Sequence, residues 1–159
     1  MRFPIDIPFV QRLGFELLSM GEGEAELAVT VDESLLNSFG VAHGGLVMTL
    51  LDVAMAHAAR SVGSAQDAAR SAAPPGETAS VVTIEMKTSF MRPGEGRLIA
   101  QGKLLHRTAT LAFCEGRVRG AQGDLCAHAT ATFKYLRALP TAARGMKTPT
   151  GHLVGPGSD

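Results

Sequence analysis

The chain has 159 residues, of which 45% are hydrophobic but only 5% aromatic, and its 15 basic and 15 acidic residues give a formal net charge of zero. This length predicts one domain with a sizeable core, and the lack of a Lys/Arg cluster argues against a nucleic-acid partner. The first residues lack the apolar run of a signal peptide, and no stretch reaches membrane-spanning length. We therefore expect a cytoplasmic protein without a membrane partner.

The cysteines and histidines predict neither a disulfide nor a metal site. Cys114 and Cys126 both fall in strand-like segments, and without a secretory signal they are interpreted as small core residues. The five histidines show no ligand spacing with the cysteines or with one another; they are His43, His57, His106, His128 and His152.

The first half of the chain predicts a hairpin followed by one long helix. A short helix or lid is expected over 4–13, and the alternation in 15–20 and 24–31, with glycines between them, predicts two paired strands. Leucine, valine and alanine then recur at helical spacing from Gly44 to about Arg60. The helix therefore has one apolar face, on which His57 also falls.

The second half predicts a loop, four strands and a tail. Residues 61–80 are rich in Ala, Ser, Gly and Pro and are interpreted as a long loop, with room for a helical turn over 67–72. Strand-like runs follow over 81–91, 97–107, 110–119 and 125–136. The tail from residue 140 lacks periodicity and is expected to be disordered. One helix among six antiparallel strands predicts an α+β fold with the helix on one face of the sheet.

The segment from Asn37 to Gly45, directly before the long helix, carries the chemistry. It holds an amide, the His43 imidazole and the glycine pair Gly44-Gly45, and glycines at a helix start leave backbone N–H groups free for a ligand. The helix also contains a single acid, Asp52, which is costly to bury without a partner or a role. Donors for a developing negative charge together with one carboxylate are typical of an acyl-transfer or hydrolysis site.

The spacing within the helix predicts a dimer if these groups share one task. Gly44 and Asp52 lie roughly 12 Å apart along the axis at ~1.5 Å per residue, further than a carboxylate reaches. Two antiparallel copies would let each glycine turn meet the Asp52 of the other chain. On the helical wheel Asp52 lies among Met48, Thr49, Ala56 and Ala59, a face suited to a second helix or to a substrate chain.

The pattern Asn37-x5-His43-Gly44-Gly45-x6-Asp52 resembles the signature of hotdog-fold acyl-CoA thioesterases of the phenylacetic-acid-degradation (PaaI) type, within the hydroxybenzoyl-CoA thioesterase superfamily. The resemblance covers roughly residues 10–136. It includes the strand over 82–94, which ends in the turn Arg92-Pro93, and the segment 110–113.

The resemblance implies a hotdog fold over residues 1–139, in which an antiparallel sheet wraps around one long helix. It also implies an edge-to-edge homodimer, often paired again into a tetramer. The implied activity is hydrolysis of an acyl-CoA thioester, with a medium-chain or aromatic acyl group, to the free acid and coenzyme A. No cofactor or metal is implied, since coenzyme A is part of the substrate.

The resemblance also assigns roles to residues. The Gly44 and Gly45 amides, most readily Gly44, would polarise the thioester carbonyl, aided by Asn37. Asp52 of the neighbouring chain would be the nucleophile or the general base. Thr83 would orient the water or Asp52, and His43 would shape the turn or touch the sulfur.

The substrate-binding residues are less securely placed. Where the family has a Gly followed by Lys or Arg, this chain has Thr108-Ala109, so the candidates for the coenzyme A phosphates are Arg92, Arg107 and Lys103. Met48 and Pro93 complete the predicted substrate contacts.

Other interpretations stay open at this point. On composition alone Asp52 is also compatible with a structural acid bonded across an interface, Asn37 with a turn or cap residue, and Thr83 with an ordinary strand residue. A hotdog dehydratase is a second enzyme class, which the His-Gly-Gly turn fits poorly. A non-catalytic acyl-CoA-binding or regulatory module is a third reading, and binding of acyl-CoA without thiol release would favour it.

Overall fold

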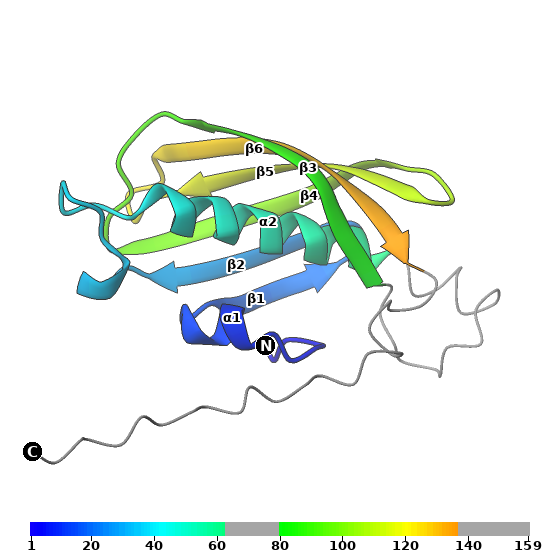
Figure 1. Ribbon diagram of the computed structural model, residues 1–159, viewed down its shortest axis with the longest axis horizontal. Helices are drawn as coiled ribbons and strands as arrows, with labels where there is room; N and C mark the ends of the chain where they lie inside the picture. The colour runs from blue at the N-terminus through cyan, green and yellow to red at the C-terminus, as the bar shows by residue number, and fades with distance from the viewer. Residues whose placement is uncertain (63–79, 137–159) are drawn as a thin grey trace, which may run out of the picture.

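A six-stranded antiparallel sheet curves around one long helix, as Figure 1 shows. The computed structural model describes residues 1–62 and 80–136, and α2 (Gly44–Ser61) lies across the concave face of the sheet. The strand order is β1-β2-β4-β5-β6-β3. The strands are β1 (Glu16–Gly21), β2 (Glu24–Thr30), β3 (Ser80–Phe90), β4 (Arg97–Arg107), β5 (Leu111–Arg119) and β6 (Leu125–Leu136). The predicted α+β class is therefore confirmed.

The observed elements differ from the predicted ones mainly at the N-terminus. The expected helix over 4–13 is one short helix, α1 (Pro8–Arg12), and a 3-10 turn, η1 (Glu33–Leu35), has no counterpart in the prediction. The long helix and all six strands agree with the prediction to within a residue or two. The expected helical turn over 67–72 and the tail from 140 lie outside the described residues.

Helix α2 packs closely on the middle of the sheet because two strands carry glycine beneath it. A Cβ atom on Gly102 of β4 would lie 2.4 Å from the carbonyl carbon and oxygen of Ala54, so only glycine fits there. A Cβ on Gly116 of β5 would lie 3.0 Å from Leu51 Cδ2. His57 is buried on the same helix, as expected, and its Nδ1 lies 2.8 Å from the Val53 carbonyl oxygen.

The structure corrects one part of the face predicted around Asp52 on α2. Met48 is 38% exposed, but Ala59, which the helical wheel placed beside Asp52, is fully buried. The curvature of the sheet explains the difference, because strands cover the C-terminal half of the helix on more than one side. Tyr135 of β6 reaches this half and donates a hydrogen bond of 3.0 Å to the Ala59 carbonyl.

Strand β3 forms one edge of the sheet and contains a bulge. Its only strand neighbour within the described part of the chain is β6, with which Thr83 pairs at Phe133 and Glu85 at Thr132. Ile84 is therefore an extra residue in the ladder. Because of it, Thr83 and Met86 both face α2 although they are three positions apart, a spacing that would put them on opposite faces of a regular strand.

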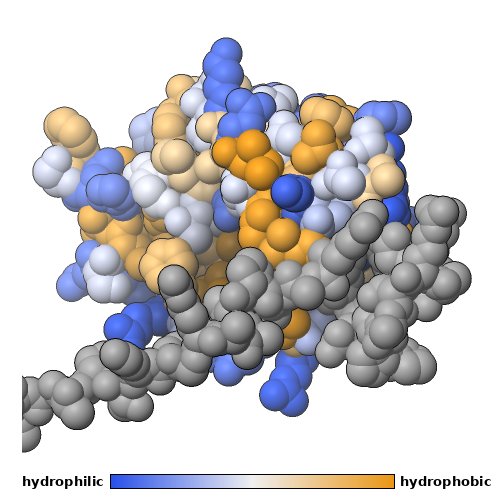
Figure 2. Space-filling model, turned by 45° about the vertical axis from the view of Figure 1, so that its right-hand side comes forward, coloured by the Kyte–Doolittle hydropathy of each residue, from blue (hydrophilic) through white to orange (hydrophobic). Residues whose placement is uncertain are grey.

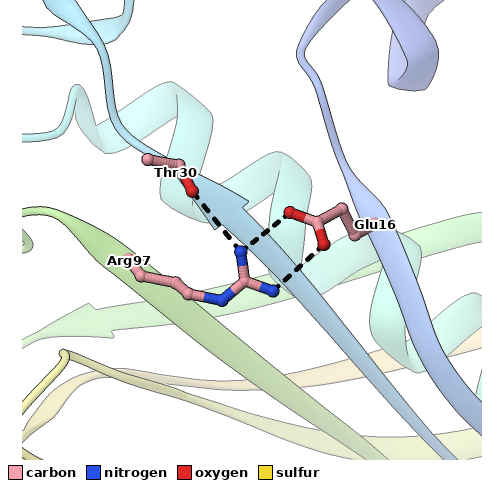
Figure 3. Close-up of polar contacts among 3 residues, drawn as sticks. All are labelled: Glu16, Thr30 and Arg97. Atoms are coloured by element: carbon pink, nitrogen blue, oxygen red, sulfur yellow. Dashed lines mark hydrogen bonds and ion pairs between the residues drawn. The ribbon is translucent and has the colours of Figure 1, made fainter.

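At the other side of the sheet an arginine links three strands (Figure 3). The Arg97 guanidinium donates to both carboxylate oxygens of Glu16, at 2.8 and 3.1 Å, and to Thr30 Oγ1 at 3.4 Å. It thereby joins β1 to β4 across β2. The Arg97 hydrogen bond lowers the pKa of Glu16, and both groups lie at the surface.

Hydrophobic side chains also reach the surface, and Figure 2 shows them interspersed with hydrophilic ones on the face that it presents. Three of them lie on β3, where Val82, Ile84 and Phe90 are 41%, 56% and 54% exposed. The two cysteines, by contrast, are buried and free, as predicted.

Candidate functional site

The turn before α2 is fixed by its own asparagine. Asn37 Oδ1 accepts hydrogen bonds from the backbone N–H groups of Phe39 at 2.8 Å and Val41 at 3.4 Å, and Gly40 takes a positive φ of 75°. This arrangement confirms the turn role that the sequence left open for Asn37. The Nδ2 group of Asn37 has no hydrogen-bond partner within residues 1–62 and 80–136 and is a spare donor beside the helix.

His43 is the N-cap of α2. Its Nδ1 accepts a hydrogen bond of 2.9 Å from the Gly45 N–H, and its carbonyl oxygen accepts from Leu46 and Val47. Nδ1 is thus engaged as the acceptor of the cap. At this helix start the Gly44 N–H is then the donor with no acceptor among the described residues.

A cavity of about 370 Å³ adjoins this free donor. The Phe90 ring forms its wall next to Gly44, since a Cβ on Gly44 would lie 3.6 Å from Phe90 Cζ. The lining is mostly apolar, and its residues are Asn37, Val41, Ala42, Gly44, Val47, Phe90, Met91, Arg92, Pro93, Gly94 and Cys126. The structure thus brings together four residues predicted from the sequence, namely Asn37, Gly44, Arg92 and Pro93. A larger cavity between the N-terminal segment and β1 contains none of the predicted residues.

Asp52 lies apart from this cavity, two turns further along α2. It is half-buried and accepts a hydrogen bond of 2.7 Å from Thr83 Oγ1 on β3. Burial raises the pKa of Asp52, and the bond from Thr83 opposes the rise. The result is a positioned carboxylate of raised basicity, which suits proton transfer.

The predicted substrate residues divide into two groups. Arg92 and Pro93 line the cavity, and Arg92 Nη1 donates to the Leu125 carbonyl at 3.3 Å. Arg107 lies at the opposite end of α2, where Nη1 donates to the Val62 carbonyl at 2.9 Å and the guanidinium stacks over Tyr135. The structure therefore does not bring Arg107 to the cavity of its own chain.

The remaining two candidates are also exposed and lie outside the cavity lining. Lys103 forms an exposed ion pair with Glu24, with 3.6 Å between nitrogen and oxygen. Met48 lies on α2 between Gly44 and Asp52. This position keeps Met48 available to a ligand or to a second chain that spans the two groups.

Sequence reasoning missed Phe90 and Cys126 as cavity residues. The signal for Phe90 was an aromatic residue at the end of a strand, immediately before the Met-Arg-Pro turn. Cys126 had no distinguishing pattern, and burial raises the pKa of its thiol. A protonated thiol is a poor nucleophile, so Cys126 contributes to the wall of the cavity rather than to its chemistry.

Other site types find no support in the part of the chain that is described. Over residues 1–62 and 80–136, no three His, Cys, Asp or Glu side chains cluster in a way that could hold a metal ion. Among the described helices, none is long and apolar enough to cross a membrane.

Several known proteins are similar to this chain in sequence or in fold. The acyl-coenzyme A thioesterase PaaI of Escherichia coli is 37% identical over 82 residues, which are 52% of this chain and 48% of that protein. The phenylacetic acid degradation protein PaaI of Thermus thermophilus superposes with a TM-score of 0.68 at 26% identity, covering 82% of this chain and 100% of that one. A conserved protein of Pseudomonas aeruginosa gives a TM-score of 0.71 at 26% identity, over 84% and 97% of the two chains.

The family model described as Thioesterase superfamily matches residues 39–127, which include the glycine turn, α2 and most of the sheet. Sequence and fold therefore agree, and this chain belongs to the Thioesterase superfamily as a PaaI-type hotdog thioester hydrolase.

Proposed function

We propose that the protein hydrolyses an acyl-CoA thioester to the free acid and coenzyme A, and that the acyl group is medium-chain or aromatic. The observation that carries the proposal is the free Gly44 N–H at the N-terminus of α2, beside an apolar cavity. A single N–H at the positive end of a helix dipole suits the oxygen of a thioester carbonyl, on which negative charge grows during attack. The apolar lining of the cavity suits an uncharged acyl group rather than a sugar or a phosphate group.

In this proposal Asp52 supplies the chemistry in one of two ways. As a general base, Asp52 takes a proton from water while the water oxygen attacks the carbonyl carbon; the carbon–sulfur bond then breaks and coenzyme A leaves with a proton. As a nucleophile, the Asp52 carboxylate attacks the carbonyl carbon, the carbon–sulfur bond breaks and coenzyme A leaves as a thiolate that takes up a proton. Water then hydrolyses the resulting anhydride, which releases the free acid and restores Asp52. Thr83 orients the carboxylate in both routes, as its bond of 2.7 Å to Asp52 supports.

The proposal requires two chains for each site. Gly44 and Asp52 lie on one straight helix, and Asp52 does not line the cavity beside Gly44. A two-fold dimer with antiparallel α2 helices would place the Gly44 of one chain near the partner's Asp52. The symmetry would form two such sites in each dimer. Arg92, at the cavity, is then our candidate for the coenzyme A phosphates.

The first experiment measures thiol release from short, long and aromatic acyl-CoAs. We expect turnover by the wild type and its loss in Asp52→Ala with the dimer intact. Release that is equal in the two proteins would contradict the role of Asp52. Binding of acyl-CoA by the wild type without any release would favour the binding module instead.

A second pair of variants isolates the Gly44 donor. Gly44 is the first helical residue and His43 has φ −60° and ψ 136°, so proline fits at position 44 and removes only the N–H. We expect Gly44→Pro to lower kcat by about 10²- to 10³-fold. Gly44→Ala keeps the N–H at an ordinary contact distance from Phe90 and is the matched control.

Mixed dimers then test whether the site is shared. A dimer of one Asp52→Ala chain and one Gly44→Pro chain keeps one complete site if the two groups come from different chains, and none if they come from the same chain. Because half of randomly assorted dimers are mixed and each has one of two sites, we expect about a quarter of wild-type activity. Activity no higher than that of the parent variants would reject the shared site.

A further inference from the structure

The N-terminal segment, residues 1–13, is attached to the rest of the fold by apolar contacts. Four of its side chains pack against the core, namely Phe3, Ile7, Val10 and Leu13. Over the part of the chain that is described, the hydrogen bonds of this segment stay within residues 6–15, and it forms no ion pair with another element. Such a segment can open locally while the rest of the fold stays closed. We call residues 1–13 the strap.

An aromatic contact joins the strap to α2. The Phe3 ring packs edge-on against the His57 ring, with ring centroids 5.3 Å apart and an interplanar angle of 70°. Beside this contact a cavity of about 590 Å³ lies between the strap and β1, which Figure 1 shows next to each other in blue. The strap therefore covers α2 without filling the space beneath it.

His57 is closed off from water, and one of its ring nitrogens has no partner. The residue is 1% exposed, and its Nδ1 donates to the Val53 carbonyl, because a carbonyl oxygen can only accept. Nε2 is buried without a hydrogen-bond partner among the described residues. In the neutral ring this atom carries only a lone pair. A proton on Nε2 would bury a positive charge that no acceptor compensates, which is costly.

The surrounding charges add to this cost. Burial lowers the pKa of His57, the Arg60 charge on the next turn of α2 lowers it further, and the bond to Val53 opposes the shift. No acidic side chain within residues 1–62 and 80–136 bonds to His57.

Charged groups on the neighbouring elements do not offset the Arg60 charge. Arg2 and Asp6 of the strap and Glu16 of β1 line the cavity. On the strands that pack on α2, charged side chains alternate with the buried residues that face the helix, and so point outward. Arg107 is an exception, and it adds a second positive charge near the end of α2.

We propose that the strap is a proton-sensitive cover of α2, which is closed while His57 is neutral and released when Nε2 takes up a proton. Release would let water from the existing cavity reach the imidazolium. The closed form holds this proton less tightly than the open form. Its stability is therefore fully present above the ordinary pKa of histidine and is lost as pH falls below it. The proposal does not depend on the proposed function, although the covered turn of α2 begins at Val53, directly after Asp52.

Amide hydrogen exchange of the wild type at about pH 5 to 8 measures the opening of the strap. The reporters are the N–H groups of Gln11, Leu13 and Phe15, which bond to strap carbonyls. After correction for the intrinsic pH dependence of exchange, we expect their protection to fall by up to about tenfold for each pH unit below about 6.5. The amides of β5 and β6 should keep their protection over this range, because the sheet stays closed.

Two variants test whether His57 is the group that takes up the proton. His57→Phe keeps an aromatic ring beneath Phe3 but cannot be protonated, so the protection of the strap should no longer depend on pH. His128→Gln removes a half-buried histidine from the outer face of β6 and is the control. It should leave the pH dependence as in the wild type.

The reciprocal measurement is an NMR titration of His57, which leaves the histidine itself unchanged. Phe3→Ala weakens the closed strap, so protection should fall at neutral pH and the pKa of His57 should rise toward its ordinary value. Phe9→Ala removes from the same strap a ring that is 60% exposed, and is the matched control.

Three results would overturn the proposal. They are strap protection that does not change with pH in the wild type, an unaltered pH dependence in His57→Phe, and a His57 pKa that Phe3→Ala raises no more than Phe9→Ala does. Thiol release plays no part in these measurements, so their outcome is independent of the hydrolase proposal.

Discussion

Replacing Gly102 by alanine tests how closely the sheet holds helix α2, which carries the proposed catalytic groups. The new Cβ would lie 2.4 Å from Ala54 backbone atoms, whereas ordinary contacts begin at 3.4 Å, so α2 must move away from β4 by about 1 Å. Overpacking of this kind costs about 1–3 kcal/mol. Because backbone rather than a flexible side chain blocks the Cβ, we expect Gly102→Ala to fall at the upper end of that range.

Urea unfolding measures this cost, and thiol release measures its effect on the site. With slopes of about 1–3 kcal/mol/M, the midpoint is expected to fall by roughly 1 M or more. Since α2 carries both Gly44 and Asp52, a displacement of this size is also expected to reduce turnover by about 10²-fold. Gly116→Ala, which meets only the movable ends of Leu51 and Met55, is the control and should lose less of both. An unchanged midpoint in Gly102→Ala, or one no lower than in Gly116→Ala, would refute this reasoning.

Three further predictions concern the site. Thr83→Val removes the bond that lowers the pKa of Asp52, so the acidic limb of the kcat/KM profile should move to higher pH, whereas Thr83→Ser should leave it in place. Burial makes the folded chain hold the Asp52 proton more tightly than the unfolded chain, so this group's stabilising contribution is present at low pH and is lost as pH rises through the raised pKa. Asp52→Asn should therefore raise the free energy of unfolding at neutral pH, and chemical denaturation at neutral and acidic pH should show the gain vanish in acid. His43→Ala should cost about 1 kcal/mol by loss of the N-cap, whereas His43→Asn should retain both the cap and most of the turnover if the imidazole only shapes the turn. A large loss of turnover in a stable His43→Asn variant would give the imidazole a chemical role.

The fold was largely predictable because its signals are local. Helical spacing from Gly44 onward and the alternating strands each report which side of an element is buried, and the structure confirms them. The bulge at Ile84 was not predictable, since the residues on either side still alternate plausibly without it. The burial of Ala59 was missed for a related reason, because a helical wheel assumes a flat neighbouring surface and this sheet curves around the helix.

The candidate site could be proposed from the sequence, but only part of its arrangement could be predicted. The glycine turn and Asp52 are adjacent in the sequence, so their chemistry could be inferred together, and their separation followed from the rise of the helix. The partner of Asp52 was harder to identify, because Thr83 comes from a distant strand and its type alone does not distinguish it from other strand threonines. The surroundings of Arg107 were equally hard to predict, since only the fold shows that its guanidinium stacks on Tyr135.

The bulge in β3 makes the length of this strand as important as its composition. Ile84 separates a segment that holds Asp52 in place from a segment whose outward charges lie along the sheet edge. Deleting this one residue would put the two segments out of phase, so that either Thr83 turns away from the helix or Glu85 and Lys87 turn toward it. Related sequences should therefore differ in the type of residue at position 84 but should not lack a residue there. Deleting Ile84 should lower stability and turnover more than any substitution of it.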